Sequence, residues 1–299
     1  MLSDFCFMLF GAHVSIAGGV YNAPANAKKI GCEVFQLFSR SPRGGNAPVL
    51  TKSIVAQFKS AVKENNQAES YIHTPYYINL ASTNSRIRYG SIKVIREELE
   101  RASLLGVRYV MTHLGSANDL PRKEAVKKVV EGIKKILAGY QGSALFLIEN
   151  SAGSGNIIGD QFEEISQIIN EVPSAYAGAS ADRRQAQSKI GVCLDTCHAF
   201  ASGYDLRNKK AVDGTLQKFN RIIGLKFLKM MHANDSKTDL GSHVDRHEHI
   251  GLGKIGLAGF KAIIRHPQLK KINLILETPD DESGMQESDL KVLKKLRNS

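Results

Sequence analysis

Six short apolar segments of this sequence carry, within their last two residues, a side chain that can bind a metal ion or move a proton. A single histidine at the end of a strand is most often a hydrogen-bonded residue of the core or rim. Six such groups are difficult to explain by packing, because burying that many ionisable side chains without partners is prohibitively costly. Imidazole and carboxylate ligands suit Zn²⁺ and related divalent ions, so the pattern indicates a metal site. The six side chains are His73, His113, Glu149, Asp195, His232 and Glu277.

Three further candidate ligands follow these segments on expected loops. His198 comes three residues after Asp195 in the segment LDTCH, and Asp245 and His247 are two residues apart in DRH. The nine side chains exceed what one ion needs. At about three or four ligands per ion they indicate two or three metal ions with bridging carboxylates. Three divalent ions would outweigh the charge of four carboxylates. The filled site would therefore attract an anion such as a phosphodiester, and would lower the pKa of a bound water.

The apolar segments alternate with amphipathic ones along the chain. Arg122–Ala138 and Ser91–Leu105 carry apolar residues at three- and four-residue steps, as helices do, and Gly106 is a plausible end for the second helix. Eight alternations, about one every 37 residues, favour a TIM (β/α)8 barrel over an open sheet, as a single α/β domain spanning 1–299. The expected strands are Phe5–Val14, Glu33–Phe38, Tyr71–Thr74, Arg108–His113, Ala144–Glu149, Ile190–Asp195, Phe227–His232 and Ile272–Glu277.

The barrel explains how residues so far apart in sequence can form one site. All strands of a parallel barrel end on the same face, so the six strand-end side chains must meet in one bowl. His13 ends the first expected strand and faces the same bowl, where it either supports a ligand or serves the fold. Asn150 and Asn234 lie next to or near ligands and are either hydrogen-bond donors to them or polar residues of the rim. For His249 we expect a role in orienting its loop rather than direct ligation.

Composition excludes several other classes of protein. The 299 residues are 42% hydrophobic and 23% charged, which fits neither a disordered nor a fibrous chain. No apolar run approaches the roughly 18 residues that span a bilayer, and the apolar Phe5–Phe10 lacks the basic leader of a signal peptide, so we expect a cytoplasmic protein. Four cysteines without a CxxC pair do not make a disulfide framework. The formal charge of +11 attracts polyanions, nucleic acid above all, although a generally basic surface would have the same charge.

Four segments together resemble the endonuclease IV family, the trinuclear zinc apurinic/apyrimidinic endonucleases of base-excision repair. They are GAHVS (Gly11–Ser15), IENSAG (Ile148–Gly153), LDTCHAFASGYD (Leu194–Asp205) and HANDSK with DRHEHIGLGKIG (His232–Gly256). The resemblance extends from Gly11 to Glu277, and the family is a TIM barrel, in agreement with the strand count.

The resemblance implies a grouping of the nine candidate ligands around three Zn²⁺ ions. His73, His113 and Glu149 match the ligands of one zinc, and Glu149 bridges to a second zinc. Asp195, His232 and Glu277 complete the second site, and His198, Asp245 and His247 match the third. Glu149 or Glu277 is then the catalytic group that orients the attacking hydroxide.

The resemblance also implies side chains that enter DNA at the lesion. Arg43 and Tyr76 occupy roughly the matching loops. The match is looser here, because Gly44 and Gly45 follow Arg43, Thr74-Pro75 precede Tyr76, and Ser242-His243 replaces the more usual Ser-Arg. The chain has no tryptophan, so any wedge must be a tyrosine, an arginine or an aliphatic side chain.

The expected activity is cleavage of the phosphodiester bond on the 5′ side of abasic sites in double-stranded DNA. The family's products are a 3′-hydroxyl and a 5′-deoxyribose phosphate, and the resemblance favours a monomer that associates with the nucleoid through DNA. A sugar isomerase or epimerase of the same barrel type is one alternative, but it needs fewer metal ions and no basic face. A zinc-containing DNA-binding protein without catalysis is the other, and sequence alone cannot display the open metal position that would distinguish an enzyme from it.

Overall fold

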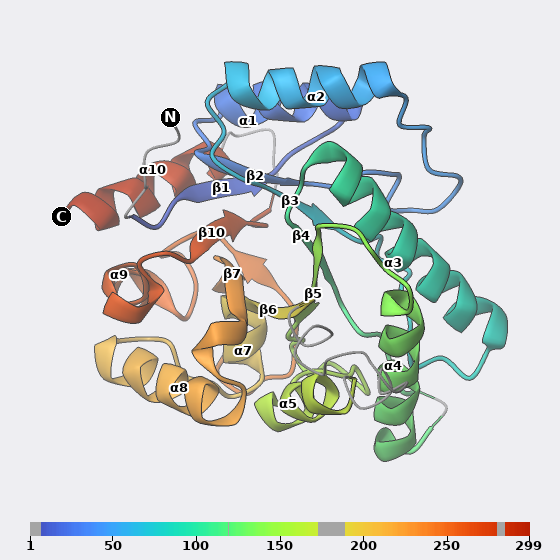
Figure 1. Ribbon diagram of the computed structural model, residues 1–299. Coiled ribbons are helices and arrows are strands. Elements are labelled where there is room, and N and C mark those ends of the chain that lie inside the picture. The colour runs from blue at the N-terminus through green and yellow to red at the C-terminus, as the bar shows by residue number, and fades with distance from the viewer. Residues whose placement is uncertain (1–6, 119, 173–188, 280–284) are drawn as a thin grey trace.

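Eight short parallel strands close into a barrel in the computed structural model, which describes residues 7–118, 120–172, 189–279 and 285–299 (Figure 1). Around the barrel the strands follow the order β1-β10-β7-β6-β5-β4-β3-β2, and β1 also pairs with β2. The predicted TIM barrel is therefore confirmed. The strands are β1 (Phe10–His13), β2 (Val34–Leu37), β3 (Ser70–His73), β4 (Tyr109–Thr112), β5 (Leu145–Glu149), β6 (Ile190–Asp195), β7 (Leu228–His232) and β10 (Asn273–Leu276).

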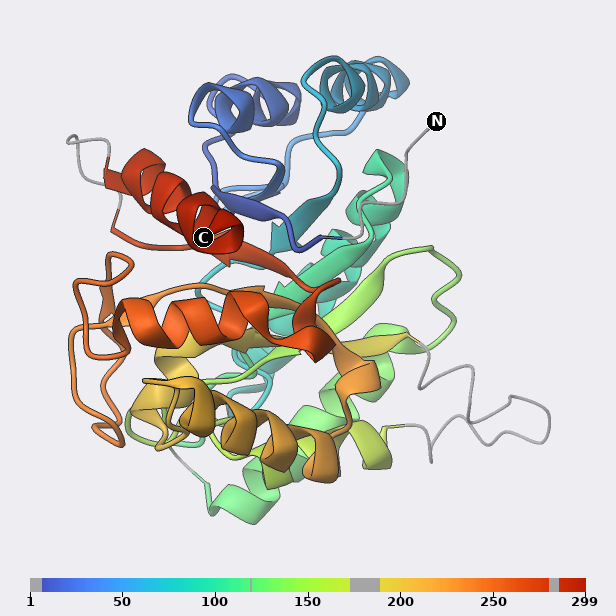
Figure 2. The same cartoon turned by 90° about the vertical axis from the view of Figure 1, so that its left-hand side faces the viewer.

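Helices cover the outside of the barrel, and α10 packs against both β1 and α9 (Figure 2). Two very short strands, β8 (Asp235–Ser236) and β9 (His247–Glu248), form a separate antiparallel pair in the loop after β7. No helix within the described ranges is long and apolar enough to cross a membrane. The α-helices are α1 (Ala23–Lys29), α2 (Lys52–Glu64), α3 (Ser85–Leu105), α4 (Arg122–Leu137), α5 (Phe162–Glu171), α7 (Thr196–Ala201), α8 (Lys209–Ile222), α9 (Gly256–Arg265) and α10 (Met285–Asn298).

Most predicted element boundaries agree with the structure to within one residue, and the exceptions are the starts of α3 and β1. The helix expected from Ser91 begins six residues earlier, because Asn84 caps it by accepting hydrogen bonds from the backbone N–H groups of Arg86 and Ile87. It ends at Gly106, whose φ of 80° is the left-handed conformation that glycine adopts most easily. The first strand, expected over Phe5–Val14, covers only Phe10–His13, so its predicted start was wrong for residues 7–9; residues 5 and 6 lie outside the described residues.

The barrel interior determines which strand residues reach the site. One buried cluster surrounds the barrel beneath its helices, and a smaller one fills the inside. Successive side chains of a strand point to opposite faces, so the residue two positions after an inward-facing core residue also faces inward. In β5, Glu149 therefore lies on the same inward face as Leu147, and in β7, His232 lies on the same inward face as Met230. The inner cluster consists of Leu9, Val34, Tyr71, Tyr109, Met111, Leu147, Cys193, Met230 and Ile275.

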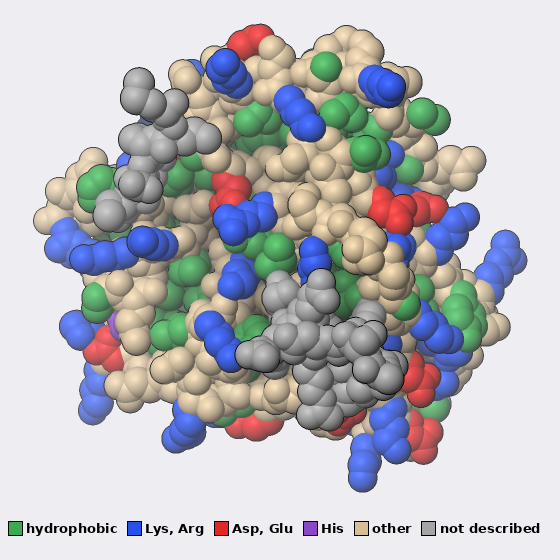
Figure 3. Space-filling model, in the orientation of Figure 1, with side chains coloured by type: hydrophobic (Ala, Val, Ile, Leu, Met, Phe, Trp, Pro, Cys, Tyr) green, Lys and Arg blue, Asp and Glu red, His purple; other side chains and the backbone are tan. Residues whose placement is uncertain are grey.

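Charged side chains are distributed broadly over the surface. On the face seen in Figure 3, lysine and arginine side chains are spread among aspartates and glutamates rather than gathered in one patch. On this face the charges therefore form a diffuse field rather than a focused one.

Candidate metal centre

The nine sequence-predicted ligands meet at the carboxyl ends of the strands. They come from six strands or the residue directly after them, from α7, from the loop between β8 and β9, which carries Asp245, and from the start of β9, which is His247. A cavity of about 870 Å³ opens onto them, lined at its wall by Phe38, Tyr76 and His13 among others. His13 thus faces the bowl as predicted. The bowl is the one place in the described chain where the strand-end His, Asp and Glu residues gather.

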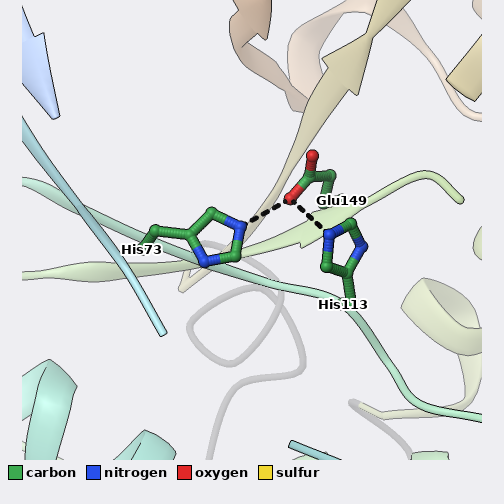
Figure 4. Close-up of side chains that lie close together, drawn as sticks. All are labelled: His73, His113 and Glu149. Carbon is green, nitrogen blue, oxygen red and sulfur yellow. Dashed lines mark hydrogen bonds and ion pairs between the residues drawn. The ribbon is translucent and has the colours of Figure 1, made fainter. Parts of the chain in front are cut away.

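One group of donors is formed by His73, His113 and Glu149 (Figure 4). The Oε2 atom of Glu149 lies 3.0 Å from Nε2 of His73 and 3.6 Å from Nε2 of His113. The Glu149 carboxylate is fully buried, and His113 is the more exposed of the two imidazoles. Three donors pointing at one another from neighbouring strands are suited to share a metal ion.

The other oxygen of Glu149 belongs to a second group. Glu149 Oε1 lies 2.8 Å from Nδ1 of His232, and this nitrogen is 3.8 Å from Asp195 Oδ2 and 3.4 Å from Glu277 Oε2. The ligand atoms of the four residues all lie within 4.8 Å of one another. Glu149 therefore stands between two donor groups with one oxygen directed to each, the geometry of a bridging carboxylate.

His198, Asp245 and His247 make the third group. The two oxygens of Asp245 lie 3.3 Å from Nε2 of His198 and 3.3 Å from Nε2 of His247. The same two nitrogens are 3.4 Å apart, a close approach for two groups that both titrate. Asp245 is half-exposed, so this group lies at the open side of the bowl.

Four of the five imidazoles are oriented by an oxygen on their other ring nitrogen. The Nδ1 atoms of His73, His198 and His247 lie 2.6, 3.0 and 2.9 Å from the backbone carbonyl oxygens of Thr74, Asn150 and Glu277. A carbonyl oxygen only accepts, so each of these Nδ1 atoms carries a proton, and Nε2 is the nitrogen that faces the cluster and can bind a metal ion once it is unprotonated. This tautomer is the one that a metal ligand requires.

The fourth imidazole, His232, has the opposite orientation: Gln36 contacts its Nε2, and its Nδ1 faces the carboxylates. The Gln36 amide oxygen lies 2.7 Å from His232 Nε2, and its nitrogen donates to Glu277 Oε1 at 2.5 Å and lies 2.9 Å from His13 Nδ1. Sequence reasoning missed this buried residue. The signal was present, because Gln36 follows the inward-facing Val34 by two positions. It is polar but is neither His, Asp nor Glu, so its residue type does not mark it as a metal ligand.

Two asparagines hold the acidic residues of the second group, mostly through their backbone. Asn234 donates from Nδ2 to Asp195 Oδ2 at 2.6 Å, and its Oδ1 accepts from the backbone N–H of Glu277 at 2.8 Å. Asn150 exchanges two hydrogen bonds with the backbone of Asp195, at 2.7 and 3.2 Å. Both asparagines thus contact the ligands rather than merely lining the rim.

Burial and charge oppose each other in the pKa of Glu149. Burial alone would raise it, but the imidazoles of His113 and His232 hold the pKa of this carboxyl well below its usual range. For Glu277, burial is likewise outweighed by His232, His13 and His73, and its pKa is lowered. Both carboxyls are ionised at neutral pH and are available as ligands or proton acceptors.

The third group holds its protons tightly. Burial favours a neutral imidazole, but the charges of Asp195 and Asp245 raise the pKa of His198 to about 10. The hydrogen bond to Asp245 and the charge of Asp195 overcome burial in the same way and raise the pKa of His247 to about 9. Without a cation between them, these imidazoles carry the positive charge that balances the carboxylates. A divalent cation would replace that charge, so the donor set fits a metal ion.

The two predicted DNA-contacting residues lie at different distances from the bowl. Tyr76 is on its wall, 72% exposed, with its ring edge-on to Phe38 at 5.1 Å between centroids. Arg43 is exposed on the β2–α2 loop, whose neighbouring Ser41 and Pro42 line the bowl. His249 points elsewhere, since its Nδ1 lies 2.8 Å from Asp289 Oδ2. This contact favours the predicted loop-orienting role.

The fold and donor groups define a TIM barrel with a candidate metal centre, and comparison with known proteins specifies its class. The family model described as "Xylose isomerase-like TIM barrel" matches residues 24–296. "Probable endonuclease 4" of Methanoculleus marisnigri is 40% identical over 277 residues, which cover 92% of this chain and 94% of that protein. The protein of the same name from Nitrosopumilus maritimus is 40% identical over 278 residues, covering 92% and 95%.

A solved structure agrees with these relatives. The crystal structure of endonuclease IV from Thermus thermophilus is 33% identical, with a TM-score of 0.82, and the match covers 97% of this chain and 99% of that one. The chain belongs to the endonuclease IV family.

Proposed function

We propose that the protein is a DNA-repair endonuclease that cleaves the phosphodiester bond 5′ to abasic sites in double-stranded DNA. It leaves a 3′-hydroxyl and a 5′-deoxyribose phosphate, and its cofactor is three Zn²⁺ ions. The observation that carries the proposal is Glu149, whose two oxygens face two different donor groups, next to a third group built around Asp245. The relatives named endonuclease 4 and endonuclease IV support the same activity.

Each donor group would hold one ion. His73, His113 and Glu149 would hold the first, Glu149 with Asp195, His232 and Glu277 the second, and His198, Asp245 and His247 the third. When bound, the ions offset charge on the phosphoryl and leaving oxygens and lower the pKa of water.

The protein's own contribution is orientation and proton acceptance. Glu149 and Glu277 are ionised, so either can accept a proton from the attacking water and hold it in line with the phosphorus. Gln36 and Asn234 restrain Glu277 from its side chain and from its backbone. A restrained carboxylate loses little freedom when the substrate arrives, which is the advantage of a pre-organised site.

The bowl suits a nucleotide that has left the helix. An abasic nucleotide stacks poorly and is the least costly to extrude, and the excess positive charge of the chain attracts the phosphates on either side without reading sequence. Tyr76 offers a stacking surface at the bowl's wall, and Arg43 is an exposed cation directly after Ser41 and Pro42, which line the same bowl. We propose action as a monomer on nucleoid DNA in the cytoplasm, with residues 1–299 as one endonuclease domain, because one chain supplies all nine ligands.

A nicking assay with metal analysis tests the proposal. The protein, loaded with Zn²⁺ and freed of excess metal, is mixed with a duplex carrying one abasic site and with its undamaged counterpart. We expect cleavage of the damaged strand alone, directly 5′ to the lesion, and about three zinc ions per chain. Binding of the abasic duplex without a nick would favour the non-catalytic DNA-binding alternative. Isomerisation of a ketose without any nick would favour the sugar epimerase.

A further inference from the structure

The loop between β2 and α2, residues 38–51, is long and contains neither helix nor strand. Arg43, in the first half of the loop, is exposed, and Val49 near its end is 77% exposed. Within the described residues the structure gives the Arg43 guanidinium no hydrogen bond or ion pair; only the backbone N–H of Arg43 is bonded, to Ser41 Oγ at 3.3 Å. A cation left free on an exposed loop is available to an anionic partner.

Both ends of this loop are fastened by a single side chain from α3. Arg101 donates from Nη2 to the carbonyl oxygen of Ser39 at 2.7 Å and from Nη1 to that of Pro48 at 2.6 Å. Its Nε donates to Ser39 Oγ at 2.6 Å. The planar guanidinium thus joins residues nine positions apart and closes the segment between them, residues 39–48, into a ring.

A buried carboxylate holds the same end of the loop. Glu98, one turn before Arg101 on α3, is fully buried, accepts from Ser39 Oγ at 2.5 Å and forms a short ion pair with Arg40 Nε. Arg40 is 3% exposed and also contacts Glu97 at 2.9 Å. We call Glu98, Arg101 and Arg40 the loop clamp.

Burying the charged groups of the loop clamp costs free energy, so stability alone does not account for them. Removing one carboxylate and two guanidiniums from water costs several kcal/mol per ion, and apolar side chains of equal size often stabilise a fold as well or better. Charged groups that form hydrogen bonds to particular backbone atoms specify one loop conformation more strictly than apolar packing does. The fastened segment includes Ser41 and Pro42, which line the bowl, and Arg43 follows directly.

We infer that Glu98 and Arg101 are positioning residues for DNA binding: from the outer helix α3 they hold residues 39–48 in the conformation that presents Arg43 to the duplex. The inference rests on the proposed function. It assigns to the loop clamp an effect on affinity for abasic duplex, transmitted through Arg43, and no effect on the metal ions or on the chemical step.

A double-mutant cycle tests this coupling. Arg101→Lys keeps the positive charge but cannot reach the carbonyl oxygens of Ser39 and Pro48 together. Single-turnover cleavage of an abasic duplex is measured for the wild type, Arg101→Lys, Arg43→Ala and the double variant, giving a half-saturating enzyme concentration and a maximal rate. We expect each single variant to raise the half-saturating concentration about tenfold, the order of one charge-assisted hydrogen bond. The half-saturating concentration of the double variant should be little higher than that of either single variant, because Arg101→Lys already misplaces Arg43.

Two further variants and one readout complete the experiment. Glu98→Gln, which keeps the shape but removes the negative charge, should show the same non-additivity with Arg43→Ala. Glu100→Gln, an exposed change on the same helix at a carboxylate whose ion pair within the described residues is with Arg96, is the matched control and should behave as the wild type. Bound zinc per chain should be equal in all variants.

The outcomes separate the inference from the proposed function. Additive effects of the Arg101 and Arg43 changes, or an equal fall of the maximal rate in Arg101→Lys and Glu98→Gln, would overturn the inference, because the loop clamp would then serve only the fold. A wild type that does not cut abasic duplex would instead overturn the proposed function.

Discussion

His247 and Glu277, 30 residues apart in the chain, are joined by a contact of 2.9 Å between Nδ1 of the imidazole and the backbone carbonyl oxygen of the glutamate. Two candidate ligands from different donor groups are thus fixed to each other through the backbone. Asn234 extends the connection, since it accepts from the N–H of Glu277 and donates to Asp195. The second and third donor groups therefore share a hydrogen-bonded frame that does not depend on a metal ion.

Removal of the Asn234 amide should weaken this hydrogen-bonded frame and, through it, zinc binding. Asn234→Ala loses the bonds to Asp195 and to Glu277, and we expect zinc affinity to fall by about 10–100-fold, as is usual when a group that orients a ligand is lost. Competition with a chromophoric chelator measures the change. Asn170→Ala, an exposed change on α5, is the matched control. Unchanged zinc affinity in Asn234→Ala would show that the frame does not hold the metal centre.

Loading of metal should release protons. The pKa values of His198 and His247, raised to about 10 and 9, mean that both imidazoles are protonated at pH 7 in the metal-free protein. A metal ligand must be unprotonated, so zinc binding expels about two protons from the third group, and His73 and His232, whose pKa values are also raised, add to the release. Zinc affinity therefore rises with pH until these pKa values are passed. Calorimetric titration of metal-free protein in two buffers of different ionisation enthalpy counts the protons. Zinc uptake without proton release at pH 7 would contradict the assignment of the third group.

Glu149→Gln should separate chemistry from binding. The amide keeps the shape but bridges poorly and cannot accept a proton, so single-turnover cleavage should slow by about 10²–10⁴-fold, the usual contribution of a positioned base. Affinity for abasic duplex should change little, because Glu149 is fully buried beneath the bowl. Zinc content is measured in parallel. A near-normal rate with the metal ions still bound would sink the mechanism proposed here.

The fold was predictable because its signal repeats. Each strand is apolar, and each strand-end ligand lies two residues beyond a core residue such as Leu147 or Met230, so type and spacing together indicated both barrel and bowl. The supporting contacts were not predictable from residue type. Gln36 and Asn234 are chemically ordinary, and the loop clamp joins α3 to a loop some 60 residues earlier through backbone carbonyl groups that a sequence does not display.

The affinity for DNA should depend more on ionic strength than on the base sequence of the duplex. The chain carries 40 Lys and Arg against 29 Asp and Glu, and phosphate contacts release condensed counterions on binding. We expect the logarithm of the affinity to fall linearly with the logarithm of salt concentration, with similar slopes for abasic and undamaged duplex and tighter binding of the abasic one. Fluorescence anisotropy over a salt series, with short duplexes and metal-free protein to prevent cleavage, gives both slopes. A flat dependence would remove the electrostatic part of the proposal.

Tyr76 should contribute to recognition of the lesion and not to the reaction. Its ring is 72% exposed on the wall of the bowl and rests edge-on against Phe38, so Tyr76→Ala removes little buried surface and should leave the stability of the protein nearly unchanged. If the ring stacks at the gap left by the missing base, its loss should reduce the preference for abasic over undamaged duplex by about 1–3 kcal/mol. Tyr76→Phe retains the ring and is the matched control. Anisotropy on both duplexes measures the preference, and single-turnover cleavage at saturating enzyme should stay near the wild-type rate. Equal discrimination by Tyr76→Ala and the wild type would mean that the lesion is recognised elsewhere in the bowl.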